Sequence, residues 1–208
     1  MPVDYMLPAA VGLLVIHISD FAAIKKVPLV KPLVWVAGGG LLIYSIVQIW
    51  LSPDRLSLPA WSAWLGWALL AVSSIMLVYS LFVNLPFFKT YVATGVGDKL
   101  VTTGFYALAR HPGVLWTALL AVSIVLVSKS RPALVAAPLF ILLDVLVVVI
   151  QDRIFFPRMF PGYDAYRRQT PMLLPNRNSL RAFADSLKAA KPPKGDGRHV
   201  WRRNGGAG

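Results

Sequence analysis

The sequence predicts an all-α, polytopic integral membrane protein with about five transmembrane helices and a cytoplasmic C-terminal helical segment. Apolar residues make up 57% of its 208 residues and charged residues only 14%, against about 25% charged in an ordinary soluble domain. Several apolar runs approach or exceed the roughly 18 residues that indicate a membrane span. Basic residues gather in the segments on one side of these runs. Membrane lipids are therefore the expected surroundings of the chain.

The expected spans cover residues 5–24, 33–51, 60–84, 112–128 and 133–150. The first is not typical of a signal peptide, because the residues before it carry no positive charge. The fourth starts at Pro112, and proline suits the first turn of a helix, where its missing N–H would be unpaired anyway. Residues 129–132 alone join the last two spans, so these spans are expected to be antiparallel neighbours.

The chain is expected to have three parts. Residues 1–84 form three N-terminal spans with few polar groups, and residues 85–175 hold the other two spans and nearly every candidate functional group. Residues 176–208 form a basic tail, predicted to contain an amphipathic interfacial helix followed by a disordered segment. In a membrane protein such a tail favours anionic lipid headgroups, so no nucleic-acid partner is expected.

The distribution of basic residues predicts the orientation. Eighteen of the 21 lysines and arginines lie in 25–32, in 85–111 and after Ile150. The positive-inside rule places these segments in the cytoplasm, with the N-terminus outside. We expect a prokaryotic inner membrane protein. Lys129 and Arg131, in the short loop on the other side, oppose this orientation.

Several kinds of site are excluded or disfavoured. The chain has no cysteine, which excludes disulfides, thiolate chemistry and cysteine-based metal sites. Its three histidines lie too far apart in sequence to suggest a metal centre. No phosphate-binding loop or Rossmann glycine fingerprint occurs. The sequence therefore indicates no metal.

One hairpin brings the candidate functional groups together. Because spans four and five are antiparallel, Arg110-His111-Pro112 and Gln151-Asp152 are expected to meet at the cytoplasmic face. Residues 153–168, which are rich in aromatic residues and arginines, follow directly. The N-terminus of a helix attracts anions through its free N–H groups and its dipole. This face is therefore predicted to hold a charged small molecule beside the bilayer.

These segments also carry a resemblance. Residues 100–112 are similar to the first signature of the isoprenylcysteine carboxyl methyltransferase and phospholipid methyltransferase family of integral membrane enzymes. The second signature, a glutamate pair, Phe-Gly, Tyr-x-x-Tyr and a proline-bounded end, falls on residues 151–152, 159–160, 163–166 and 171–175. Both halves stand in the expected order. Gln151 replaces the first glutamate and Asp152 shortens the second.

The resemblance implies binding of S-adenosylmethionine at the cytosolic face. The implied cofactor-binding residues are Tyr106, Arg110, His111, Pro112, Asp152 and Tyr163. Arg110 would suit the carboxylate of the cofactor, Asp152 its ammonium or ribose hydroxyls, and an aromatic face its sulfonium.

The resemblance also implies a methyl acceptor that enters from the bilayer and is apolar or amphiphilic. An isoprenylcysteine-like carboxylate, a lipid amine and a small thiol all fit this description. His111 is the candidate general base for an amine or a thiol, and Arg167 would hold a carboxylate or phosphate of the substrate.

Other interpretations stay open. The chain could be a non-enzymatic membrane scaffold or an NADPH-dependent enzyme of the sterol-reductase type. A transporter is disfavoured, because the polar groups cluster at one face rather than at the midplane. Asp144 and the pair His17/Asp20 lie inside spans, where they either tie helices together or serve a function. Trp116 either gates a lipid entrance or packs against a neighbouring helix.

Overall fold

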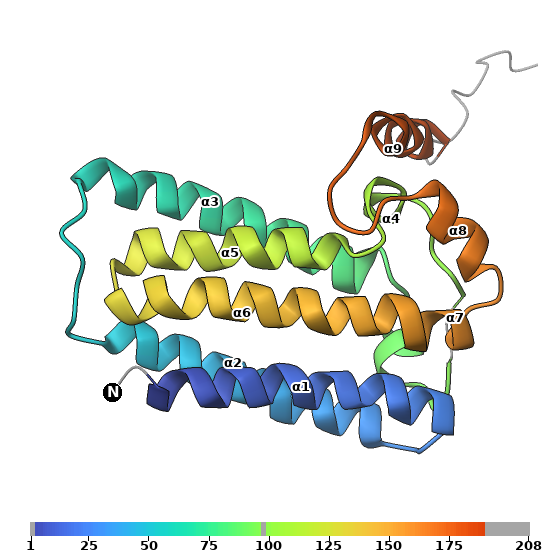
Figure 1. Cartoon of the computed structure of the whole chain (residues 1–208), viewed down its shortest axis with the longest axis horizontal. Coiled ribbons are helices and arrows are strands. Elements are labelled where there is room, and N and C mark those ends of the chain that lie inside the picture. Colours follow the sequence, from blue (N-terminus) through green and yellow to red (C-terminus); the bar gives the residue numbers. More distant parts are fainter. Residues whose placement is uncertain (1–2, 97–98, 190–208) are drawn as a thin grey trace, which may run out of the picture.

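The computed structural model describes residues 3–96 and 99–189, and within these ranges every regular element is helical. Five apolar helices lie side by side in a bundle (Figure 1). They are α1 (Val3–Lys25), α2 (Val30–Leu51), α3 (Ala60–Val78), α5 (Pro112–Ser128) and α6 (Arg131–Ile150). Four of these, with their continuations, are long and apolar enough to cross a membrane, and α5 is a shorter apolar helix of 17 residues. The predicted all-α polytopic fold is confirmed.

The predicted limits of the spans are close to those of the helices, but the last span continues beyond the predicted end at residue 150. Helix α6 continues through η3 (Gln151–Phe155) and α7 (Phe156–Met159), so the apolar span runs over Arg131–Met159. The prediction ended it at residue 150 because polar residues follow. Gln151 and Asp152 do not end the helical segment, and their side chains bond to other parts of the protein.

Two helix pairs are held by close backbone contact at glycines. In the α1–α2 pair, a Cβ atom added to Gly38 would lie 2.5 Å from the carbonyl oxygen of Gly12. In the α3–α5 pair, a Cβ on Gly66 would lie 2.8 Å from Cβ of Leu126. Small residues allow this approach, which suits helices that must associate by packing within lipid. Helix α6 contacts both α1 and α5 and so joins the two pairs.

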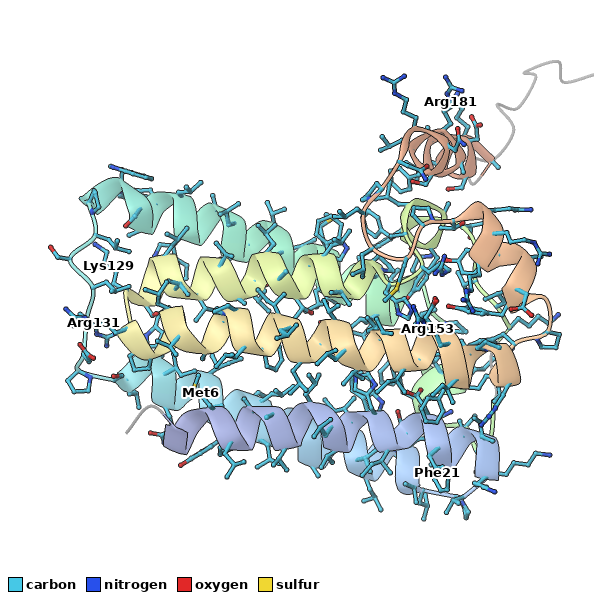
Figure 2. All side chains as sticks on the ribbon, viewed as in Figure 1. Met6, Phe21, Lys129, Arg131, Arg153 and Arg181 are labelled. Carbon is cyan, nitrogen blue, oxygen red and sulfur yellow. The ribbon has the colours of Figure 1, made fainter. Side chains whose placement is uncertain are left out.

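At the end of the bundle where the N-terminus lies, the loop between α2 and α3 pairs with the loop between α5 and α6 (Figure 1). Arg55 donates to the carbonyls of Trp50 and Ser128, both at 2.7 Å. Lys129 donates to Leu58 O at 3.2 Å, and Arg131 lies 3.4 Å from Asp54. Figure 2 labels Lys129 and Arg131 at this end. The three cations that oppose the charge asymmetry therefore bind helix ends, loop carbonyls and a carboxylate.

The short helices lie at the opposite end of the bundle. They are η1 (Tyr79–Val83), η2 (Phe88–Val92), α4 (Phe105–Leu108), α8 (Tyr163–Gln169) and α9 (Arg177–Ala189). Of these, η1 directly continues α3. Figure 1 views α9 nearly end-on, whereas the five long helices run across the picture, so α9 lies across the bundle direction. Such an orientation suits a helix in the plane of a membrane surface. The predicted disordered segment after α9 lies outside the described residues.

The amphipathic helix α9 contacts the bundle through its apolar face. The Phe183 ring stacks on Phe105 with centroids 5.5 Å apart and planes 9° from parallel. The Ser186 hydroxyl accepts a hydrogen bond from Gly104 N at 3.1 Å. Arg181 points away from the bundle (Figure 2). These contacts fix the helix against α4, close to the segment that leads into Arg110.

Candidate functional site

Arg110 and Asp152 form a buried, bidentate ion pair. Arg110 Nε donates to Oδ1 of Asp152 at 2.7 Å, and Arg110 Nη2 donates to Oδ2 at 2.9 Å. This planar arrangement is the strongest that a guanidinium and a carboxylate can make. It joins the start of α5 to η3, the continuation of α6. The prediction that the short 129–132 loop brings these two segments together is confirmed.

The remaining Arg110 nitrogen bonds to the last turn of α8 and to the residue directly after it. Nη1 donates to the carbonyls of Arg167, at 3.0 Å, and Thr170. The backbone adds two bonds, from Arg110 N to Pro171 O at 2.9 Å and from His111 N to Met172 O at 3.1 Å. Burial alone would lower the pKa of Arg110, but the hydrogen bonds and charge of Asp152 raise it above its ordinary value. Arg110 is thus a permanent cation. It holds the start of α5 against η3 and the end of α8.

Asp152 is surrounded by donors. Besides Arg110, the Tyr163 hydroxyl donates to Oδ1 at 2.6 Å, and Arg167 Nε lies 3.8 Å from Oδ2. Burial and the bond to this carboxylate raise the pKa of Tyr163, so its phenol stays protonated. The carboxylate therefore fixes the position of an aromatic ring as well as that of a guanidinium.

His111 has a buried ring with an unused nitrogen. The imidazole stacks on Phe156, with centroids 5.4 Å apart and planes 13° from parallel. Nε2 lies 3.4 Å from Oδ1 of Asp152 but outside hydrogen-bond geometry, and it has no hydrogen bond within the described residues. Burial lowers the pKa of His111 below its ordinary value. The ring is therefore neutral near pH 7 and can accept or donate one further hydrogen bond.

Tyr166, the last residue of the 163–166 match, helps to shape this region, as do Asn84 and Phe156, which the sequence did not mark. Tyr166 OH donates to Tyr106 O at 2.6 Å, which ties α8 to α4. Asn84 Oδ1 accepts from Phe105 N at 3.2 Å, and its amide donates to Thr103 O at 3.3 Å. In the sequence, Asn84 is only a polar residue at the end of an apolar run, and such residues are too common to indicate a functional position. Phe156 was visible only as part of an aromatic-rich segment.

A cavity of about 860 Å³ leads from this region into the bundle. Five of the predicted site residues line it, namely Tyr106, Arg110, His111, Pro112 and Tyr163, whereas Asp152 and Arg167 are not among the lining residues. Deeper in the bundle its walls are largely apolar and come from α1, α2, α5 and α6. Its volume falls within the roughly 300–1,000 Å³ of small-molecule sites. We call the end near His111 the mouth.

A second polar cluster lies on the cavity wall between α1 and α6. Gln151 Nε2 donates to Oδ2 of Asp20 at 2.7 Å and lies 3.1 Å from Nδ1 of His17. His17 Nδ1 and Asp20 Oδ2 are 3.5 Å apart. The sequence left open whether His17 and Asp20 tie helices together or serve a function, and their contacts with Gln151 do tie α1 to the helix that follows α6. Gln151, which stands where the resemblance expects a glutamate, thus binds α1.

Trp116 packs rather than gates. Its ring lies 5.3 Å from that of Phe105 in an edge-on arrangement, and Phe105 in turn carries the Phe183 ring of α9. It is not among the residues that line the cavity. The geometry therefore favours the packing role among the two that the sequence left open.

Comparison of the chain with models of protein families, with curated proteins and with solved structures gives no match. Among the described residues, no group of three or more histidine, cysteine, aspartate or glutamate side chains is placed to hold a metal ion. The function therefore has to be argued from the geometry of the mouth and the cavity.

Proposed function

We propose that the protein is an S-adenosylmethionine-dependent methyltransferase that acts on an apolar or amphiphilic acceptor in the membrane. The observation that carries the proposal is the cavity of about 860 Å³, which joins a polar, aromatic mouth to an apolar interior between the helices. A cofactor at the mouth and an acceptor chain in the interior would each meet matching surroundings. The resemblance of residues 100–175 to the methyltransferase signatures supports the same assignment.

The residues at the mouth fit the cofactor. His111 Nε2 is a buried polar atom without a hydrogen bond in the described chain, and it can serve a ligand. The rings of Tyr106 and Tyr163, which line the cavity, suit a sulfonium cation. Arg110 adds a fixed positive charge for a carboxylate, although its nitrogens already bond to the protein. Asp152 acts through Arg110 and Tyr163 by holding both in place.

In this proposal the cofactor supplies a methyl carbon already activated by positive sulfur. The carbon–sulfur bond breaks as the bond to the acceptor forms, so the protein mainly aligns the two and excludes water. Neutral His111 would take the proton released by an amine or thiol acceptor, whereas a carboxylate acceptor needs no base. Arg167 would neutralise a carboxylate or phosphate from outside the cavity, near Asp152.

The acceptor would enter from the lipid. Ile43 of α2 and Val78 at the end of α3 both line the cavity, yet they are 65% and 52% exposed on the surface of the bundle. The cavity wall is thus shared with the surface that faces lipid acyl chains. An apolar chain could reach the interior from the bilayer without crossing water.

We also propose that the mouth faces the cytoplasm of a prokaryotic cell, with the N-terminus outside. Eighteen of the 21 basic residues support this orientation. The three others have local partners in the loops at the opposite end. The cytoplasm is also where the cofactor would be supplied.

The first experiment is thermal unfolding of the detergent-purified protein with S-adenosylmethionine or with NADPH. A ligand at 100 times its Kd stabilises by about 2.7 kcal/mol, which for a chain of this size raises Tm by roughly 5–10 °C. Stabilisation by S-adenosylmethionine alone supports the proposal, and a screen of acceptors with labelled methyl groups then identifies the substrate. Stabilisation by NADPH alone would contradict it and favour a reductase.

One observation favours a second candidate, a non-enzymatic scaffold. Every nitrogen of Arg110 bonds to the protein, and Asp152 is enclosed by Arg110 and Tyr163. A hydrogen-bond network of this kind could keep a structural role in a protein that no longer binds a cofactor. In that case neither cofactor would change the unfolding temperature.

A further inference from the structure

Asp144 is a buried carboxylate that the mouth does not use. It belongs to α6, and the residue is only 8% exposed. No hydrogen bond or ion pair reaches it in the part of the chain that the structure describes. A carboxylate inside a membrane span is costly unless something compensates it. Its burial without a partner is therefore the feature to explain.

The carboxylate lies on the wall of the cavity. One face of α6, with the first residue of η3, lines the cavity over about five turns. Its residues include Ala133, Ala137, Phe140, Asp144, Val148 and Gln151. Apart from Asp144 and Gln151 this face is apolar. Asp144 thus presents a negative or hydrogen-bonding group to an otherwise apolar space.

The depth of Asp144 separates it from the mouth. It precedes Asp152 by eight residues on a continuous helix, which is about 12 Å along the axis at 1.5 Å per residue. A polar group bound at Asp144 is therefore not the group that meets His111. It would be a second polar group, located deeper between the helices.

The charges around Asp144 favour a cation as the ligand. On α1, His17 and Asp20 also line the cavity, and both contact the uncharged Gln151 at the start of η3. The cavity is also lined by Lys31, Lys99 and Arg110. Lys31 donates to backbone carbonyls of Lys89 and Gly95, and Arg110 is paired with Asp152. The neighbours of Asp144 on its own face of α6 are apolar, and an isolated carboxylate there attracts an ammonium group rather than an anion.

We propose that Asp144 binds the protonated amine of an amphiphilic ligand whose alkyl chain occupies the apolar part of the cavity. The ligand class is an alkylammonium, either a single-chain amine or the amine of a lipid headgroup drawn into the cavity. The ammonium donates hydrogen bonds to the Asp144 carboxylate, and no covalent step is involved. This site does not depend on methyl transfer at the mouth.

The test measures saturable binding of radiolabelled dodecylamine to the protein in phosphatidylcholine nanodiscs, with protein-free nanodiscs as the blank. We expect saturable binding to the wild type and at least a tenfold weaker affinity for Asp144→Asn, which keeps the shape but removes the charge. Asp54→Asn is the matched control, because Asp54 lies in the loop at the opposite end with a side chain 59% exposed. Its affinity should equal that of the wild type.

Two further arms complete the test. Unlabelled dodecanol, of the same chain length, should compete at least tenfold less well than dodecylamine in the wild type. This comparison decides the matter even if Asp144→Asn does not fold. Nanodiscs containing phosphatidylethanolamine then distinguish the source, since competition by this lipid assigns the site to a headgroup amine and its absence to a single-chain amine. Equal affinity in wild type and Asp144→Asn, or equal competition by dodecanol, would overturn the proposal.

Discussion

Arg110 differs from a ligand-binding arginine in that all three of its guanidinium nitrogens already bond to the protein. Two of them bond to Asp152, and the third bonds to the carbonyls of Arg167, in α8, and Thr170, directly after it. A buried ion pair of this kind adds little net stability compared with apolar residues of the same shape, but breaking it leaves an uncompensated charge. The pair therefore acts chiefly to specify how the signature segments meet.

The first prediction concerns this pair. Arg110→Ala should lower the free energy of unfolding by about 3–5 kcal/mol, because Asp152 would stay buried without its partner. The double variant Arg110→Met/Asp152→Leu should lose much less than either single change. Denaturant titrations in detergent measure both effects. Additive losses in the double variant would show that the two residues do not act as a pair.

The second prediction concerns pH. Because burial lowers the pKa of His111, the unfolded chain binds a proton more readily than the folded chain as pH falls. Stability should therefore decrease below the ordinary histidine pKa of about 6.5, by at most about 1.4 kcal/mol per pH unit. His111→Gln should remove this part of the decrease between pH 6.5 and 5. Identical pH profiles for the two proteins would mean that His111 is not buried as a neutral ring.

At this scale the sequence could predict which groups meet but not how they bond. A loop of a few residues forces the ends of two helices together, so the contact of Arg110 with Asp152 follows from chain geometry. The bonds from Arg110 to the carbonyls of Arg167 and Thr170 depend on where α8 ends, which no residue pattern specified. The orphaned nitrogen of His111 likewise depends on where Phe156 packs.

Among the helices, the consecutive glycines of α2 have different roles. Gly38 faces α1, where an added Cβ would lie 2.5 Å from Gly12 O, whereas a Cβ on Gly40 would meet nothing within 4 Å. Backbone atoms cannot move aside as a flexible side chain can. The position of each glycine on the helix therefore decides its tolerance of substitution.

The third prediction uses this contrast. Gly38→Ala should destabilise the protein by about 1–3 kcal/mol through overpacking of α1 against α2. Gly40→Ala, two residues away, should be neutral or stabilising by up to about 1 kcal/mol, because alanine favours the helix. Unfolding of the two variants in the same detergent gives the comparison. Equal effects at both positions would contradict the close α1–α2 contact.

Helix limits were predictable where apolar composition and turn chemistry agreed. The start of α5 at Pro112 and its end at Ser128 match the expected span. The end of α6 at Ile150 also matches, but the continuation of the helical span to Met159 was not predicted, because polarity in sequence does not distinguish a solvent-exposed residue from one bonded inside the protein. Gln151 and Asp152 are of the second kind.

For the molecule as a whole, the two ends of the helix bundle differ both in charge and in their hydrogen bonds. One end carries the mouth, the short helices and most of the basic residues, and the other carries the paired loops (Figure 1). The cations of the paired loops cap carbonyls or pair with Asp54. They have a local structural reason to be there, so they weigh little against the predicted orientation.

The fourth prediction tests this orientation. Cysteines introduced one at a time at Ser57 and Asn178, in a chain with no other cysteine, should react differently with a membrane-impermeant reagent in intact cells. Both positions are exposed, unlike the neighbouring Ser179, which is buried and accepts a hydrogen bond from Asn176 N at the start of α9. We expect labelling of Ser57→Cys from outside and of Asn178→Cys only after lysis. The reverse result would invert the topology.

The most direct test of the central claim is the affinity of the protein for S-adenosylmethionine, measured by titration calorimetry on the detergent-purified wild type and on His111→Ala. We expect binding to the wild type and about tenfold weaker binding to the variant, because one hydrogen bond of up to about 1.5 kcal/mol is lost. Asp54→Asn should bind as the wild type does. Absence of binding to the wild type at millimolar cofactor, or equal affinity in His111→Ala, would contradict the assignment of the mouth as the cofactor site.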